Sequence, residues 1–246
     1  MKGVLLAGGE GSRLGQLTAG KNKHLLLVRG ETMISYGIRK MAAAGLEELL
    51  LVTGSRHLAD FEDFLERNPF PGLSIHLVPQ ERPGGIGEAL ALCGRLLGDP
   101  AEPIVLLLGD NLFEQALPPL IQSWRSGGHR ARIHLSLVDD PERFGIASLD
   151  PEGRLAHLSE KPTHPDSRLA VTGLYFLPAE AAEVARRTAP SPRGEVEMIA
   201  ILRHYLEAGE LDHALLGGWW VDSGTPEGLA LAEKFLEPSG PAEYGE

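Results

Sequence analysis

The chain has 246 residues, 43% of them hydrophobic and 23% charged, with a formal net charge of −11. Such a balance is typical of a globular protein and argues against a general nucleic-acid binder, which would show a basic stripe. No apolar run reaches the ~18 residues that a membrane helix needs. Cys93 is the only cysteine, which excludes an internal disulfide, and the start Met1-Lys2-Gly3 lacks a signal-peptide pattern. We therefore expect a cytoplasmic protein in which Cys93 is buried on a helix.

Strand and helix patterns alternate through the first half of the chain. After an apolar run at 4–7, we predict strands at 49–53, 73–78 and 104–108 and helices at 33–44, 58–66 and 86–97. Thr32 is the expected N-cap of the first helix, and Gly45 is the expected left-handed residue after it. Such alternation predicts a parallel sheet covered on both faces, with ligands bound beyond the carboxyl ends of its strands.

The second half has shorter strands and later helices. We predict strands at 133–138, 146–150, 154–158 and 218–221, a hairpin turn at 150–153, and helices at 179–188, 195–208 and 226–235. The last helix has a strong start, because Thr225 is a capping residue and Pro226 follows it. No linker divides the chain, so we expect one domain over 1–246, with halves at 1–130 and 131–236 and a frayed tail at 237–246.

A glycine-rich turn follows the first apolar run. Gly8, Gly9 and Gly11 leave room for backbone N–H groups to surround an anion, and Arg13 offers a planar set of donors for phosphate oxygens. The dinucleotide-binding pattern fails here because Leu14 stands where its third glycine belongs. A near match to the P-loop at 15–22 also fails, since Asn22 replaces the Ser or Thr that binds magnesium.

Charged residues recur at further strand ends. Asp110 ends one predicted strand and Asp222 another, and two carboxylates near a phosphate loop suit Mg²⁺. Alone, Asp110 is also consistent with the start of a turn, and the adjacent Glu160 and Lys161 are also consistent with a solvated surface pair. Lys23 follows the glycine turn as a further candidate for phosphate binding.

These motifs, in their order along the chain, resemble the sugar-1-phosphate nucleotidyltransferases, and among them the glucose-1-phosphate thymidylyltransferases. The resemblance covers residues 2 to about 235 and rests on the segments 6–14, 23–26, 80–89, 108–111, 140–145, 160–162, 170–175, 193–195 and 221–225. It implies a Rossmann-like three-layer α/β/α fold with a mixed, mainly parallel central sheet and a smaller β-rich part that binds the sugar. The family joins a nucleoside triphosphate and a sugar 1-phosphate with loss of pyrophosphate.

The resemblance also implies roles for individual residues. It places Arg13, Lys23 and Lys161 in catalysis, Asp110 and Asp222 on Mg²⁺, Leu6, Gly8, Gly9, Gly11, Gln80, Gly85 and Asp110 on the nucleotide, and Gly145, Glu160, Lys161 and Val171 on the sugar. It implies no nucleic-acid or membrane partner, and it leaves a homo-oligomer open.

The chain departs from the family pattern at several positions. His24 stands where the family usually has Gln, and Leu27 where it has Pro, so the preference for thymidine is less secure than the reaction. After Glu197 the sequence continues with Met198, Ile199 and Ala200, which removes polar groups from that helix. The helices that build an allosteric site in longer relatives do not follow residue 235, and we expect no feedback regulation through such a site.

Three other readings compete with this one. The same transfer with UTP or CTP is the first alternative. A glycosyltransferase is the second, but these enzymes usually carry an Asp-x-Asp metal motif where this chain has Asp110-Asn111-Leu112. A nucleotide-sugar sensor built on a disabled transferase is the third, and it would be expected to lack the arginine, lysines or carboxylates that are present here.

Overall fold

A computed structural model describes the chain except residues 10, 12–13, 16–17, 19, 129 and 237–246. Its strands are β1 (Lys2–Ala7), β2 (Leu27–Val28), β3 (Glu31–Thr32), β4 (Glu48–Gly54), β5 (Ser74–Gln80), β6 (Pro103–Leu108), β7 (Asn111–Phe113), β8 (Ala131–Leu137), β9 (Gly145–Leu149), β10 (Leu155–Glu160), β11 (Leu169–Pro178), β12 (Leu211–Leu215) and β13 (Trp220–Asp222). Its α-helices are α1 (Met33–Ala43), α2 (Leu58–Arg67), α3 (Gly85–Leu97), α4 (Leu117–Gly127), α5 (Ala181–Arg187), α6 (Met198–Glu207) and α7 (Pro226–Phe235).

One nine-stranded sheet runs through both halves of the chain, in the order β10-β9-β11-β6-β1-β4-β5, with β8 beside β11 and β12 beside β8. Strands β6, β1, β4 and β5 are mutually parallel, whereas β11 runs antiparallel to β6, β8 and β9. The predicted mixed sheet is confirmed. Two short strands, β7 and β13, pair outside it and extend past the end of β6.

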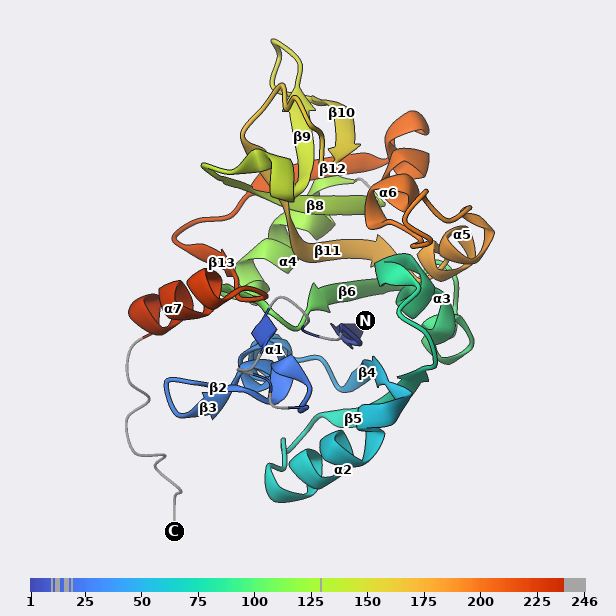
Figure 1. Ribbon diagram of the computed structural model, residues 1–246. Coiled ribbons are helices and arrows are strands. Elements are labelled where there is room, and N and C mark those ends of the chain that lie inside the picture. Colours follow the sequence, from blue (N-terminus) through green and yellow to red (C-terminus); the bar gives the residue numbers. More distant parts are fainter. Residues whose placement is uncertain (10, 12–13, 16–17, 19, 129, 237–246) are drawn as a thin grey trace.

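Helices cover both faces of this sheet, which confirms the three-layer architecture. Side chains of a strand alternate between the two faces. Val4 and Leu6 of β1 accordingly pack toward α3, α5 and α6, and Leu5 and Ala7 pack toward α1, α2 and α4. Helices α3, α5 and α6 lie together on one side of the sheet (Figure 1). Cys93 is buried in the first of these layers, as expected, and burial raises the pKa of its thiol to about 12.

The predicted elements are present, with ends that shift by a few residues. Gly45 has the expected left-handed φ of 74°. The turn at 150–153 joins β9 to β10, and the Thr225 hydroxyl accepts a hydrogen bond from the Gly228 N–H at 3.1 Å as the cap of α7. Thr32 occupies the N-cap position of α1, but its hydroxyl bonds to the Ser35 hydroxyl at 2.6 Å and does not cap the helix backbone.

Two central elements were not predicted. Strand β11 lies between β6 and β8 at the centre of the sheet, and α4 begins with prolines that interrupt its apolar pattern. Helix α6 starts at Met198, not at 195, so 195–197 form a loop. The predicted tail at 237–246 lies outside the described residues. Within the described chain, no helix combines the length and apolar character needed to cross a membrane.

Candidate active site

A cavity of about 620 Å³ opens beyond the carboxyl ends of β1 and β6. Its opposite wall comes from β9, β10, β11 and the segment 195–199. It is lined by every predicted site residue that the structure describes: Leu6, Gly8, Gly9, Gly11, Lys23, Gln80, Gly85, Asp110, Gly145, Glu160, Lys161, Val171 and Asp222. Arg13 lies outside the described residues. Residues far apart in the sequence therefore meet in a single site.

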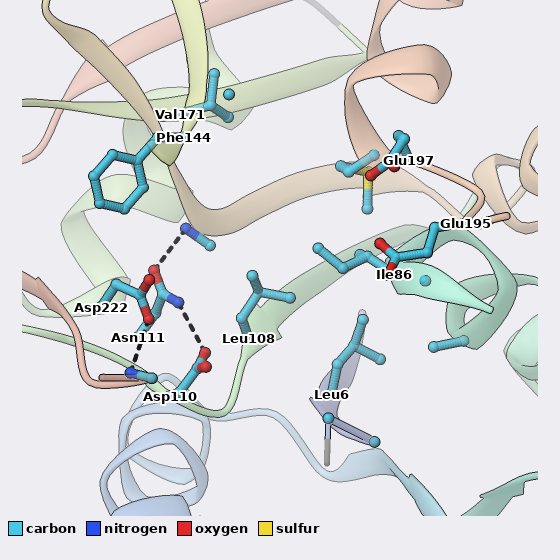
Figure 2. A pocket seen from close by; sticks show the side chains of 18 of the residues that line it. Leu6, Ile86, Leu108, Asp110, Asn111, Phe144, Val171, Glu195, Glu197 and Asp222 are labelled. Carbon is cyan, nitrogen blue, oxygen red and sulfur yellow. Dashed lines mark hydrogen bonds between the residues drawn. The ribbon is translucent and has the colours of Figure 1, made fainter. Parts of the chain in front are cut away.

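The pairing of β7 with β13 brings the two aspartates together. Asp222 lies opposite Asn111 in this antiparallel pair, and the Ser223 N–H donates to the Asp110 carbonyl at 2.8 Å. Figure 2 shows Asp110, Asn111 and Asp222 on one side of the cavity, with Glu195 and Glu197 on the other. Asp110 and Asp222, which follow separate strands of the sequence pattern, thus line the same side of the cavity.

Asp110 and Asp222 form an acidic corner of the cavity, and Asn111 holds it in place, a role that was not predicted. Its Nδ2 donates to Asp110 Oδ1 at 3.1 Å, while its Oδ1 accepts from the Gly173 N–H at 2.9 Å and from Trp220 Nε1 at 2.8 Å. Gly173 is required there because a Cβ would lie 2.6 Å from the Asn111 side chain. The amide therefore links β7, β11 and β13 and orients the Asp110 carboxylate.

Lys23 forms a buried ion pair with Asp110 through Nζ and Oδ2. Burial alone opposes ionisation of Asp110, but the charge and hydrogen bond of Lys23, with help from Asn111, keep its pKa below the ordinary value. The pair thus places one positive and one negative side chain at the edge of the cavity.

Next to this pair, Asn22 and His24 form a buried network. The Asn22 amide donates to the Ala7 carbonyl at 2.9 Å, and its Oδ1 accepts from the His24 backbone N–H at 2.9 Å and contacts His24 Nδ1 at 2.7 Å. Burial, and then the charge of Lys23, lower the pKa of His24 to about 3, so the ring is neutral at pH 7. Asn22 thus ties the segment before Lys23 to the end of β1.

The glycine turn is packed against the side chains behind it. A Cβ on Gly8 would lie 2.3 Å from Gln80 Oε1, and one on Gly9 would lie 3.3 Å from Lys23 Cε. Gly11 has a φ of 66°. These positions need glycine because of close approach at Gly8 and backbone conformation at Gly11.

The opposite wall carries a second charged group. Gly145 pairs with Glu160 across β9 and β10, and Lys161 Nζ lies 3.8 Å from Glu160 Oε1. Lys161 has a φ of 44°, and its N–H donates to the Phe144 carbonyl at 3.0 Å. Because Lys161 adopts this uncommon backbone conformation immediately after β10, the chain bends there beside the cavity.

Arg193 joins the acids of this wall and was not assigned a role from the sequence. Its Nη2 donates to Glu160 Oε1 at 3.0 Å and to Glu197 Oε1 at 2.7 Å. Burial raises the pKa of Glu160, although the hydrogen bond from Arg193 opposes this rise. The sequence signal was the segment 193–195, which we noted as a motif without assigning it a contact.

The donor set of the acidic corner fits a hard divalent cation shared with a ligand. Among the described residues no cluster of three or more His, Cys, Asp or Glu side chains is arranged to hold a metal ion. Asp110 and Asp222 supply carboxylate oxygens, and Mg²⁺ characteristically takes one or two carboxylates and completes its shell with water and substrate phosphates.

Comparison with known proteins agrees with this geometry. Residues 2–239 match the model of the family described as nucleotidyl transferase. A glucose-1-phosphate thymidylyltransferase of Neisseria meningitidis is 37% identical over 240 residues, which are 96% of this chain and 83% of the relative. A nucleotidyltransferase of low-salt glycan biosynthesis from Haloferax volcanii is 32% identical over 237 residues, 96% of this chain and 66% of that protein.

Solved structures show the same fold. A crystal structure from Bacillus anthracis, assigned as a glucose-1-phosphate thymidylyltransferase and bound to sucrose, superposes with a TM-score of 0.88 at 36% identity, covering 95% of this chain and 94% of the other. A UDP-glucose pyrophosphorylase in complex with UDP-glucose superposes with a TM-score of 0.82 at 24% identity, covering 95% and 97% of the two chains, and shows the shared fold. This chain belongs to the nucleotidyl transferase family and is a sugar-1-phosphate nucleotidyltransferase similar to the glucose-1-phosphate thymidylyltransferases.

Proposed function

We propose that the chain transfers the thymidylyl group of dTTP to glucose 1-phosphate and releases pyrophosphate. The relatives named for this reaction support the choice of substrates. The observation that carries the proposal is that one cavity holds two charged walls from distant parts of the chain: Lys23, Asp110 and Asp222 on one, Glu160 and Lys161 on the other. A reaction between a triphosphate and a sugar phosphate needs both.

We assign the first wall, with Gly8, Gly9 and Gly11, to the triphosphate and call it the phosphate end. In-line attack on the α-phosphorus moves negative charge onto the departing pyrophosphate. The Lys23 ammonium, held in place by Asp110, stabilises that charge, and the glycine turn lets backbone N–H groups approach the phosphate oxygens. Arg13 is proposed to act on the same leaving group.

Asp110 and Asp222 are proposed to hold Mg²⁺ together with the phosphates. When bound, this ion supplies a template and a Lewis acid for the transfer. Asn111 keeps the Asp110 carboxylate oriented, and the Gly224 N–H donates to Asp222 Oδ1 at 2.9 Å. The protein contributes position and charge, and no side chain is required as a nucleophile.

We assign the second wall to the sugar phosphate and call it the sugar end. Glu160 accepts hydrogen bonds from sugar hydroxyls, with Gly145 and Val171 beside it, and Lys161 neutralises the attacking phosphate. The approach of the two phosphates is electrostatically unfavourable, so a cation on each side of the reacting centre lowers the barrier. Gln80 and Gly85 contact the pyrimidine edge of the nucleotide.

A matrix of triphosphates against sugar 1-phosphates, followed by pyrophosphate release, tests this proposal. We expect dTTP with glucose 1-phosphate to give the highest kcat/KM, UTP to be accepted less well, and ATP and GTP to be poor. Turnover of a purine better than of either pyrimidine would overturn the base assignment. A galactose or mannose 1-phosphate that exceeds glucose 1-phosphate would overturn the sugar assignment.

A further inference from the structure

The amide of Gln80 is clamped by a carboxylate outside the cavity. Gln80 Nε2 donates to Glu88 Oε2 at 2.9 Å and approaches the Gly85 carbonyl at 3.4 Å. Gln80 itself is 5% exposed and lines the cavity, whereas Glu88 lies behind it on α3. Both amide hydrogens therefore point to protein acceptors.

Glycines on either side create the room for this arrangement. A Cβ on Gly84 would lie 2.2 Å from Glu88 Oε2, so the carboxylate occupies space that only glycine leaves. Gln80 Oε1 lies against Gly8 in the same way, 2.3 Å from where a Cβ would stand. Glycine at both positions, Gly8 and Gly84, is therefore needed for the contact between Gln80 and Glu88.

Among the described residues, the hydrogen-bond partners of the Glu88 carboxylate are all donors. Oε2 also accepts from the Gly84 N–H at 3.0 Å, and Oε1 accepts from Arg82 Nη2 at 3.2 Å. An ionised carboxylate has acceptors and no donor, so only the NH₂ side of the Gln80 amide can face it. The position of an amide oxygen is normally decided by its hydrogen-bond network, and here that network permits one orientation.

We propose that Glu88 is a positioning residue that sets the base selectivity of this enzyme by holding Gln80 with its oxygen toward the nucleotide. Gln80 then offers the base an acceptor and no free donor. A base with a ring N–H between two carbonyl groups, as in thymine and uracil, matches it. Cytosine, whose corresponding ring nitrogen carries a lone pair, does not match it. This inference rests on the proposed assignment of Gln80 to the pyrimidine edge.

The variant Glu88→Met tests the proposal, because methionine has a similar length and offers Gln80 neither a carboxylate oxygen nor an NH₂ group. A glutamine would not serve, since the Gly84 N–H would keep its oxygen in the position of Glu88 Oε2. Without the carboxylate, Gln80 is free to rotate its amide and to donate to cytosine. Glu81→Met is the matched control, since Glu81 is an exposed neighbour that does not line the cavity. We measure kcat/KM for dTTP and for dCTP with glucose 1-phosphate, together with Tm.

We expect the dTTP-to-dCTP selectivity ratio to fall at least about tenfold in Glu88→Met and to stay at the wild-type value in Glu81→Met. The KM for glucose 1-phosphate should stay unchanged. An unchanged ratio in Glu88→Met, or an equal loss with both nucleotides, would overturn the positioning role and leave the proposed function standing. A wild-type preference for dCTP would overturn both. Equilibrium binding of dTTP and dCTP tests the same base preference independently of turnover.

Discussion

The phosphate end and the sugar end of the cavity both carry a lysine beside an acid, but the two pairs differ in burial. The Lys23 and Asp110 side chains are 9% and 12% exposed, whereas that of Lys161 is 45% exposed. Charges removed from water act on a ligand far more strongly than charges that water screens. From this difference we propose that the buried pair contributes to the rate of transfer, and that the exposed lysine contributes to binding of the second substrate.

The largest effect is expected at the acidic corner. Asp222→Asn removes one proposed metal ligand without touching the Lys23 pair, so turnover should fall by about 10² to 10³ while Tm stays near the wild-type value. The measurement is kcat at saturating Mg²⁺ together with a thermal melt. Wild-type turnover in this variant would remove Asp222 from the site and would weaken the claim that the phosphate end sets the rate.

The two ends can be compared in acid only if loss of activity is distinguished from unfolding of the chain. His134 allows the acid dependence of folding to be tested. This core histidine on β8 is fully buried, and burial lowers its pKa from 6.5 to about 4. Between about pH 4 and 6.5, His134 is therefore protonated in the unfolded chain and neutral in the folded chain. Stability should fall as pH drops from about 6.5 to 4, by about 3 kcal/mol in total from this group.

The variant His134→Gln checks this assignment, because an amide does not titrate in this range. Urea unfolding at several pH values should show that the free energy of unfolding falls less steeply toward acid pH in the variant than in the wild type. If it falls equally steeply in both, His134 makes no such contribution, and the acid sensitivity of the fold has another source.

A small effect is expected at the base. The thymine methyl group is worth only about 1 kcal/mol in an apolar pocket, so dTTP should exceed dUTP by a few-fold in kcat/KM. A comparison of dTTP, dUTP and UTP separates the methyl group from the ribose 2′-hydroxyl. A preference for dTTP over dUTP beyond about a hundredfold would mean that the pocket reads the methyl group by more than apolar contact.

Local sequence patterns predicted those structural features that depend on adjacent residues. The glycine turn, the buried strand before Asp110 and the capped start of α7 each follow from adjacent residues, and all lie where they were expected. Strand β11 was missed because its residues 170–175 were read as a motif alone, although the run of Val171, Leu174, Tyr175 and Phe176 has the composition of a strand.

Contacts between residues far apart in the chain could not be predicted from the sequence. Asn111 stood inside a recognised motif, yet its partners Gly173 and Trp220 lie 62 and 109 residues away. The link from Arg193 to Glu160 and the clamp of Glu88 on Gln80 likewise depend on how strands and loops meet at the cavity. The sequence predicted which residues line the site, and the structure adds which side chains hold them there.

Steady-state kinetics of two lysine variants, Lys23→Met and Lys161→Met, test the difference between the two ends most directly. Pyrophosphate release is measured with both substrates varied. Lys23→Met leaves Asp110 without its partner, so each assay is run below the Tm measured for that variant. We predict that Lys23→Met lowers kcat about 10²-fold with little change in the KM for glucose 1-phosphate, and that Lys161→Met raises this KM about tenfold with kcat nearly unchanged. If both variants shift the same parameter for the same substrate, the division of labour between the two ends is wrong.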